Sequence, residues 1–218
     1  MPDWDGHRAG QHLDLRLTAV DGHQSERPYS IASGPADELV EVTVERLPGA
    51  GVSRYLVDKL REGDRLEVRG PVGGYFVWQE SFGGPLLVIA GGPGIAPLRS
   101  ILRYHRSVRS AVPVRLLYAA RDLDDLVYRD ELMRFATFDQ FDVSITLTDD
   151  QPPGWHGYRG RIDSAMLAEV GWPSGERPLV YLCGPSAFVE SAEELLVVAH
   201  HDRARIRAER FGRSGLSA

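Results

Sequence analysis

The stretch LLVIAGGPGIAP, residues 86–97, decides the fold that this chain can adopt. Its first five residues are all apolar, which is typical of a strand buried on both faces of a parallel sheet. The glycines that follow permit a tight turn, and Pro97 suits the first turn of a helix, where its missing N–H has no cost. A helix is therefore expected from about Ile95 to Arg109.

A turn between a buried strand and a helix can also bind an anion. Its free backbone N–H groups and the positive end of the helix dipole favour phosphate. The stretch differs from the dinucleotide-binding pattern G-x-G-x-x-G, because Pro97 occupies the third glycine position. It predicts a nucleotide site, with a plain strand–helix turn as the alternative.

The residues after this turn continue the alternation of strands and helices. Further apolar strands are expected at 114–120, 143–148 and 179–183. Helical patterns cover 128–135, 164–170 and 187–200. Right-handed crossovers between such strands give a doubly wound parallel α/β domain, which we place at residues 84–218.

The residues before the turn follow a different period. Apolar and polar residues alternate at 12–17, 39–45 and 65–69, which predicts antiparallel strands with one face on a core. Residues 53–60 allow a short helix at most. Residues 1–80 are therefore predicted to form an all-β domain, a small barrel or sandwich, with the border at 79–84.

Composition narrows the classes of protein. The 218 residues are 43% hydrophobic and 26% charged, as in ordinary globular domains, which excludes a disordered chain. A net charge of −6 offers no general basic field for nucleic acid. We find no run of about 18 apolar residues and no signal peptide, so a cytoplasmic protein without a membrane partner is expected.

The single cysteine, Cys183, restricts the chemistry further. One cysteine forms no internal disulfide and cannot ligate an iron–sulfur cluster on its own. The seven histidines lack H-x-x-x-H spacing, and no metal site is expected. Cys183 ends the last expected strand, at the edge where open α/β sheets bind ligands. An inert core cysteine is the alternative.

The motif Arg27-Pro28-Tyr29-Ser30 combines three useful groups in the all-β region. A guanidinium can bind phosphate in a bidentate way, an aromatic ring can stack on a flat ligand, and a hydroxyl can hydrogen-bond the ligand's edge. An ordinary strand with one surface arginine is the alternative.

In order, these motifs resemble those of the ferredoxin–NADP reductase superfamily. They are R-x-Y-S at 27–30, G-V-S at 51–53, G-P-V-G at 70–73, G-G-x-G-x-x-P at 91–97, C-G-P at 183–185 and E-R-F at 209–211. The resemblance covers nearly the whole chain. It implies an N-terminal antiparallel β-barrel that binds flavin, as FAD, followed by an α/β domain that binds NAD(P).

The resemblance also assigns residues to the flavin. Arg27 would bind its phosphate, Tyr29 would stack on its ring, and Ser30 would hydrogen-bond near its N5. The other residues implied on the flavin side are Pro28, Val44, Glu45, Gly51, Val52, Ser53 and Phe211. Phe211 stands where plant-type members have tyrosine.

The nicotinamide side is implied in the same way. Cys183 would lie beside the nicotinamide and Glu209 near the hydride path, so that both join Ser30 as expected catalytic residues. The other nucleotide-side residues are Gly92, Gly94, Ile95, Pro97, Arg121, Tyr128, Arg129, Gly184 and Pro185. Arg121 favours NADP(H) over NAD(H), because arginine can bind the 2′-phosphate, while the acidic residues within 122–125 could oppose it.

The implied function is hydride transfer from NAD(P)H to FAD, then electron transfer to a separate carrier such as ferredoxin or to a small-molecule acceptor. Two alternatives stay open. One is a nonenzymatic flavin- or nucleotide-binding electron-transfer or regulatory subunit of a larger complex, and the other is a flavin-free dehydrogenase.

Two groups of arginines predict where an acidic carrier would dock. They are Arg99, Arg103 and Arg106 on one helix face, and Arg203, Arg205, Arg207, Arg210 and Arg213 near the end of the chain. Ordinary solvated arginines are the alternative.

The start of the chain departs from the family pattern. Met1 lies too close to Gly10 to leave room for the strand that normally opens the barrel. We therefore expect either an open barrel or a true start upstream. An open barrel would expose unpaired backbone groups at its edge.

Overall fold

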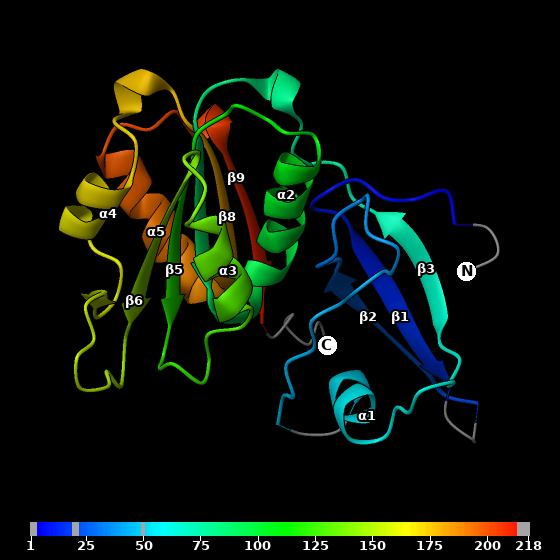
Figure 1. The fold of residues 1–218 in the computed structure, drawn as a ribbon. Helices are drawn as coiled ribbons and strands as arrows, with labels where there is room; N and C mark the ends of the chain where they lie inside the picture. The colour runs from blue at the N-terminus through cyan, green and yellow to red at the C-terminus, as the bar shows by residue number, and fades with distance from the viewer. Residues whose placement is uncertain (1–3, 19–21, 49–50, 213–218) are drawn as a thin grey trace.

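The computed structural model describes residues 4–18, 22–48 and 51–212. They form an antiparallel sheet and a larger parallel sheet, which lie in the two halves of Figure 1. The antiparallel sheet has the order β2–β1–β3. Its strands are β1 (His12–Thr18), β2 (Gln24–Ser30) and β3 (Glu67–Val72). The helix α1 (Val52–Asp58) packs against it through Val52 and Leu56, as expected for the short helix.

The antiparallel domain differs from the predicted one at residues 39–45. These residues form no strand, and their ladder contact is a single bridge between Ile31 and Val42. The alternation was nevertheless meaningful, because Val40, Val42 and Val44 pack on the apolar cluster of this domain. Alternation reports which side chains are buried, whereas a strand also needs backbone partners. In the described ranges the sheet holds three strands and does not close into a barrel.

The parallel sheet has six strands in the order β7–β6–β5–β4–β8–β9. They are β4 (Leu86–Gly91), β5 (Val114–Ala120), β6 (Phe141–Leu147), β7 (Tyr158–Arg159), β8 (Leu179–Pro185) and β9 (Ile206–Phe211). The helices are α2 (Ile95–Ser107), α3 (Arg129–Phe135), α4 (Ser164–Val170) and α5 (Ser186–Val198), with 3-10 turns at Glu80–Phe82, Gly92–Gly94, Ser174–Glu176 and Arg203–Arg205. The order reverses between β4 and β8, which confirms the doubly wound α/β architecture.

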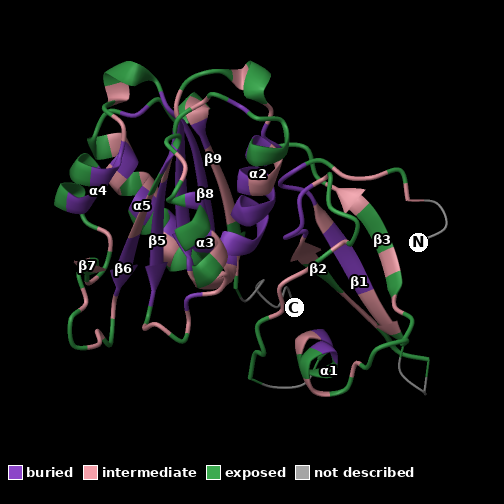
Figure 2. Ribbon diagram, in the orientation of Figure 1, coloured by how far each residue is buried: buried purple, intermediate pink, exposed green. Residues whose placement is uncertain are grey.

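Helices cover both faces of the parallel sheet. One face packs against α2 and α3, and the other against α4 and α5. Strand β4 is buried along its whole length, as its apolar run predicts, and Figure 2 shows the central strands as the buried core. None of the helices in the described ranges has the length and apolar character needed to cross a membrane.

The connection between the two sheets is itself part of the core. Phe76, Val77 and Trp78 are each at most 2% exposed, and the two rings join the cluster under α2. The carbonyl of Val77 accepts hydrogen bonds from the Tyr181 hydroxyl at 2.7 Å and from the Arg207 guanidinium at 2.6 Å. The two sheets are thus joined by packed and hydrogen-bonded contacts.

Candidate functional site

A cavity of about 530 Å³ opens at the carboxyl ends of β4, β5, β6 and β8, the edge where open α/β sheets bind ligands. Its lining includes the turn after β4 and, from the antiparallel domain, a segment of three residues. The lining residues are Thr43, Val44, Glu45, Gly91, Gly92, Pro93, Ala119, Ala120, Arg121, Asp124, Asp125, Val127, Thr148, Arg161, Ile162, Pro185, Ala187, Phe188, Ser191 and Ala192. The volume is in the range that holds a cofactor-sized ligand.

The glycines of the turn have different surroundings. Gly92 has a φ of +51° and lines the cavity, and a Cβ there would meet no atom within 4 Å. Gly94 is buried away from the cavity lining, and a Cβ there would overlap the backbone carbonyl of Cys183. Ile95 and Pro97 are buried in the first turn of α2. Gly92 therefore leaves space for a ligand, while Gly94 allows the turn to pack against β8.

The end of the cavity that follows β5 carries charges of both signs. Arg121, which is exposed, donates to Asp125 at 2.5 Å. Arg161 also lines this end, with Thr148 beyond β6. The sequence interpretation missed both of these residues. The end of the strand expected at 143–148 could have indicated Thr148, because that strand belongs to the same parallel sheet.

Four of the expected residues lie together on strands β8 and β9. Cys183 pairs with Glu209 in the register, and Pro185 pairs with Phe211. Cys183 is 2% exposed, and burial raises the pKa of its thiol, with a further rise from the Glu209 carboxylate. Burial likewise raises the pKa of Glu209 to about 7. Phe211 packs on the same apolar cluster as Cys183.

The raised pKa of Glu209 predicts a pH-dependent stability. The folded protein holds this proton up to about pH 7, whereas the unfolded chain releases it near 4.5. The contribution of Glu209 to the free energy of unfolding is full below 4.5 and is lost as the pH rises through 7. We expect Glu209→Gln to remove this decline, as measured by denaturant unfolding at pH 5 and pH 8.

The exposed carboxylate Glu190 on α5 supplies the matched control for that prediction. Glu190→Gln should keep the decline seen in the unchanged protein. The buried histidines His105 and His201, whose pKa values burial lowers, titrate equally in all three proteins and cancel. An unchanged decline in Glu209→Gln would show that its carboxyl does not hold the proton.

The motif at 27–30 ends strand β2 on the antiparallel domain. Arg27 and Pro28 are exposed, and the guanidinium donates only to the neighbouring Glu26 carbonyl at 2.7 Å among the contacts of the described residues. Tyr29 and Ser30 are half-buried. Burial raises the pKa of Tyr29, and the nearby charge of Arg27 opposes this rise. A cation, an aromatic ring and a hydroxyl are thus adjacent and partly open.

The G-V-S motif begins helix α1. Gly51 has a φ of +135°, and a Cβ there would meet nothing within 4 Å. Val52 is buried and Ser53 is half-buried at the first turn. The open backbone at Gly51 and the free charge of Arg27 fit the phosphates of a flavin nucleotide, and Tyr29 fits its flat ring.

The cavity brings together only part of the expected set. Its lining includes Val44, Glu45, Gly92, Arg121 and Pro185. Gly184 lies behind the lining, where a Cβ would press on the Phe188 ring.

Two residues expected at the nucleotide lie beside the cavity instead. The Tyr128 hydroxyl hydrogen-bonds the Thr43 hydroxyl of the antiparallel domain, and the Arg99 guanidinium lies 4.0 Å from the Tyr128 ring centre. Arg129 is exposed at the start of α3.

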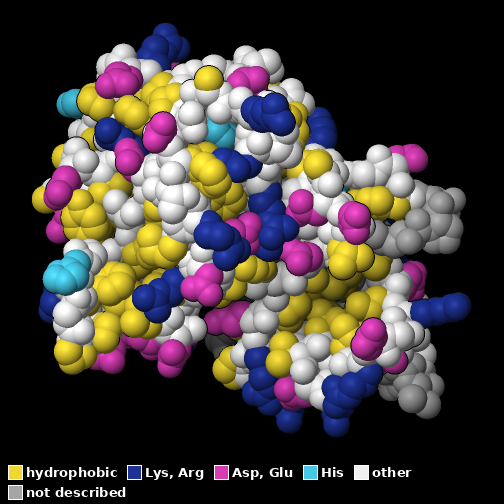
Figure 3. All heavy atoms as spheres, in the orientation of Figure 1, with side chains coloured by type: hydrophobic (Ala, Val, Ile, Leu, Met, Phe, Trp, Pro, Cys, Tyr) yellow, Lys and Arg dark blue, Asp and Glu magenta, His cyan; other side chains and the backbone are white. Residues whose placement is uncertain are grey.

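The predicted docking stripe on α2 is wrong for Arg99, which is 4% exposed. Arg99 and Arg103 both pair with Glu131, and these ion pairs lie at the junction of the domains, where Figure 3 shows basic and acidic side chains alternating. Arg106 stays exposed with its guanidinium 3.3 Å from the Phe138 ring centre.

The predicted docking group near the end of the chain is also largely engaged. Arg205 and Arg207 donate to backbone carbonyls, and Arg210 pairs with Glu193. Arg203 is exposed, and Arg213 lies outside the described residues. Among the residues the structure describes, we find no cluster of histidine, cysteine and carboxylate side chains that could hold a metal ion.

The chain matches two domain families. Residues 6–77 match the oxidoreductase FAD-binding domain, and residues 88–194 match the oxidoreductase NAD-binding domain. A glycine betaine monooxygenase reductase subunit of Pseudomonas aeruginosa is 32% identical over 208 residues, which are 94% of this chain and 56% of that protein. Ferredoxin–NADP reductase B of Sorangium cellulosum is 35% identical over 193 residues, which are 86% of this chain and 78% of that protein.

Solved structures of reductases and of a related domain are also similar to this chain over nearly its whole length. The cytochrome P450 reductase of Amycolatopsis superposes with a TM-score of 0.82 at 30% identity, covering 96% of this chain and 62% of that one. The FAD/NAD-binding domain of a Vibrio cholerae nitric oxide dioxygenase has a TM-score of 0.85 at 23% identity, over 95% of this chain and 86% of that one, and shares the fold. The chain spans a little over half the length of the glycine betaine monooxygenase reductase subunits that it matches.

Proposed function

This chain belongs to the ferredoxin–NADP reductase family of FAD- and NAD(P)-binding oxidoreductases, and on that premise we propose that it hands electrons from NAD(P)H to a separate carrier protein. As a member of this family, it is an NAD(P)H-dependent flavin oxidoreductase. The proposal concerns the acceptor, the preferred coenzyme and the residues that bind each cofactor.

The observation that carries the proposal is the shared cavity. One wall consists of Thr43, Val44 and Glu45 from the domain that matches the FAD-binding family. A second wall includes Gly92 and Pro185 from the domain that matches the NAD-binding family. A nucleotide held on the second wall would meet the flavin-binding domain directly, as transfer between two cofactors requires.

The chain's own contribution is binding, orientation and exclusion of water. A bound flavin would supply the redox chemistry, as the acceptor of a hydride from the nicotinamide and the source of electrons for the acceptor. Arg27 would hold the flavin phosphate and Tyr29 the ring, while Gly92 leaves room for the nucleotide backbone. Ser30, Cys183 and Glu209 would surround the reacting rings. The half-buried carboxyl of Glu209, with its pKa raised to about 7, would hold a proton at its oxygen below that pH.

A protein acceptor is supported by the names of the relatives. One is the reductase subunit of glycine betaine monooxygenase, and another is the reductase component of the naphthalene 1,2-dioxygenase system. Such names describe reductases that serve a separate oxygenase or ferredoxin. We therefore propose a carrier protein as the acceptor.

Anaerobic titration of the purified, flavin-loaded protein tests the function. NADPH or NADH should bleach the flavin absorption band, and adding a [2Fe–2S] ferredoxin should restore it. Flavin that neither coenzyme bleaches would favour a nonenzymatic subunit. Colourless protein that still oxidises NAD(P)H would favour a flavin-free dehydrogenase. Reoxidation by ferricyanide but not by ferredoxin would contradict the proposed acceptor.

We further propose that NADPH is preferred over NADH. Arg121 and Arg161 both line the end of the cavity beyond β5 and β6. The ion pair between Arg121 and Asp125 is solvent-exposed, and such pairs contribute little to stability. A 2′-phosphate could therefore take over Arg121, because charge-assisted bonds to phosphate are strong.

The coenzyme preference makes Arg121→Ala informative. We expect it to raise the Kd of NADPH roughly tenfold or more, the loss of one charged hydrogen-bonding partner, and to leave the Kd of NADH unchanged. Asp125→Asn should tighten NADPH, because it frees the guanidinium. Titration of the flavin difference spectrum with NADP⁺ and with NAD⁺, which differ by the same 2′-phosphate but do not reduce the flavin, measures this preference, and an equal rise in Kd for the two coenzymes would contradict it.

A further inference from the structure

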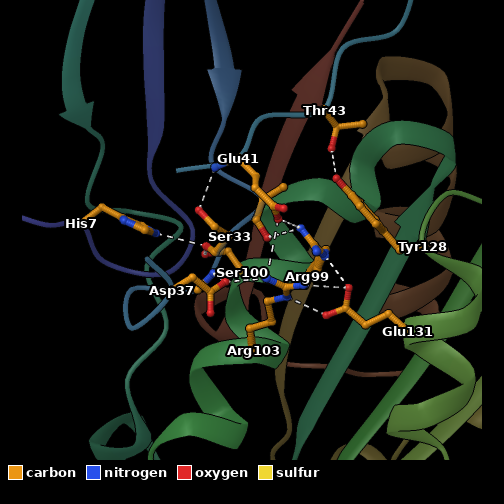
Figure 4. A network of polar contacts seen from close by, with 12 residues as sticks. His7, Ser33, Asp37, Glu41, Thr43, Arg99, Ser100, Arg103, Tyr128 and Glu131 are labelled. Atoms are coloured by element: carbon orange, nitrogen blue, oxygen red, sulfur yellow. Dashed lines mark hydrogen bonds and ion pairs between the residues drawn. The ribbon is translucent and has the colours of Figure 1, made fainter. Parts of the chain in front are cut away.

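The segment 41–45 of the antiparallel domain is held by contacts to both domains. Its own domain gives it one bridge at Val42, a hydrogen bond from the Ala32 amide to the Glu41 carbonyl, and one from the Glu41 amide to the Ser33 hydroxyl at 3.0 Å. Val42 and Val44 pack on the apolar cluster of their own domain, whereas the polar side chains reach the other domain: Glu41 pairs with Arg99 and Thr43 hydrogen-bonds Tyr128 (Figure 4). Both partners belong to the α/β domain.

Arg99 is the centre of this connection. Its side chain is 5% exposed, and its guanidinium reaches Glu41 at 2.5 Å, Glu131 at 2.7 Å and the Ala32 carbonyl at 3.1 Å. A buried guanidinium with three oxygen acceptors from separate segments fixes their relative positions. Arg103, one helical turn later, pairs with Glu131 and Asp37 and adds a second link between the domains.

Glu131 is held between these two arginines. Burial alone would raise the pKa of its carboxyl, but the hydrogen bonds from Arg103 and Arg99 outweigh burial and lower it. The carboxylate therefore stays charged at neutral pH and keeps α3 attached to α2. As a result, α2, α3 and the segment 41–45 meet at one point.

Tyr128 completes the connection from the start of α3. Its backbone has a φ of +63°, a conformation that residues other than glycine rarely adopt. Its hydroxyl contacts Thr43, and its ring faces the Arg99 guanidinium at 4.0 Å from the ring centre. Tyr128 is not part of the described cavity lining, whereas Thr43 is.

We propose that Arg99 and Tyr128 are positioning residues that set the wall formed by residues 43–45 against the nucleotide turn at Gly92–Gly94. Arg99 lies on α2, the helix that begins directly after this turn. The position of residues 43–45 and the position of the nucleotide turn are therefore both set by α2. The proposal rests on the proposed function, because the distance between those walls matters only if two cofactors react across them. Hydride transfer depends steeply on such distances.

This role differs from the nucleotide contact that the sequence predicts for Tyr128. A residue that contacts the nucleotide acts on its affinity. A positioning residue acts on the rate of flavin reduction and on the mobility of the segment it holds. The two roles can therefore be separated by experiment.

The test compares Tyr128→Phe, Thr43→Val and the double variant with the unchanged flavin-loaded protein. Each single variant deletes one hydroxyl of the same hydrogen bond. Ser107→Ala is the matched control, because it removes an exposed hydroxyl from the last turn of α2. The measurements are hydrogen exchange of the amides of residues 40–46, the Kd of NADP⁺, and the rate of flavin reduction by NADPH.

We expect each single variant to speed exchange of this segment and to slow flavin reduction by roughly three- to tenfold, the loss of one neutral hydrogen bond. The double variant should match the single ones, and the Kd of NADP⁺ in Tyr128→Phe should stay within about twofold. The control should change nothing. A raised Kd with unchanged exchange would instead make Tyr128 a nucleotide contact and overturn the proposal.

Arg99 is tested separately, since its loss leaves Glu41 and Glu131 with Arg103 as their remaining partner and could unfold the junction. Arg99→Lys keeps the charge and should retain more of the reduction rate than Arg99→Met. Equal rates for the two variants, in protein that stays folded and flavin-loaded, would overturn the role of Arg99. Failure of the unchanged protein to reduce its flavin would contradict the proposed function, whereas normal reduction in all variants would contradict only this inference.

Discussion

Replacing Gly94 by alanine is expected to slow flavin reduction by NAD(P)H by about a hundredfold and to destabilise the α/β domain by about 2 to 3 kcal/mol. The added Cβ would overlap the carbonyl of Cys183. Since Gly94 has a φ of −60°, the backbone conformation itself suits alanine, and the whole effect comes from the steric overlap. The turn must therefore move away from β8, and Cys183 and the cavity wall move relative to each other.

Two alanine variants separate this overlap from other effects. Gly175→Ala lies on the surface in a 3-10 turn with nothing within 4 Å, and it should behave like the unchanged protein. Gly92→Ala introduces strain at a φ of +51° without a clash, so it should cost about 1 kcal/mol. Thermal unfolding and stopped-flow reduction measure both quantities. A Gly94→Ala protein as fast and stable as Gly175→Ala would show that the close packing of the turn is unnecessary.

Arg27→Ala is expected to weaken flavin binding by roughly 10- to 100-fold, the value of a charge-assisted hydrogen bond to phosphate. In the described contacts the Arg27 guanidinium is held only by the carbonyl of the adjacent Glu26. Its loss therefore leaves the protein's own packing intact, and the effect should appear in the cofactor. Flavin content after purification and the Kd of FAD for the stripped protein measure it.

Arg65 offers the matched control, because it is an exposed arginine of the same domain. Arg65→Ala changes the net charge equally and should retain flavin. Arg27→Lys keeps a charge without the bidentate geometry and should fall between the two. Full flavin retention in Arg27→Ala would remove this residue from the phosphate site.

The elements that the sequence predicted well are those whose local pattern has a single physical solution. The apolar run at 86–90 is typical of a strand buried on both faces, and it lies in β4. The helix expected at 164–170 is α4 with the same bounds, because the Asp163 side chain caps its first turn and the chain turns away at Gly171.

The missed features depend on contacts between distant residues. Arg99 looked like a solvated charge on a helix, but its acceptors Glu131 and Glu41 lie 32 and 58 residues away. Strand β9 was not among the predicted strands, although Arg207 within it is used internally at the Val77 carbonyl. Arg161 reaches the cavity only because the parallel strands bring separate loops to one edge. The periodicity of a sequence gives no information on contacts between residues that are distant in the chain.

The packing of residues 76–78 against the α/β domain determines how the protein unfolds. The rings of Phe76 and Trp78 lie within the apolar cluster under α2, and the Val77 carbonyl accepts hydrogen bonds from β8 and β9. Cutting the chain at residue 84 would strip this cluster of Phe76 and Trp78 and leave an apolar hollow on the remaining half. The α/β half should therefore not survive as an autonomous fragment, and heat should melt the two halves in one cooperative transition.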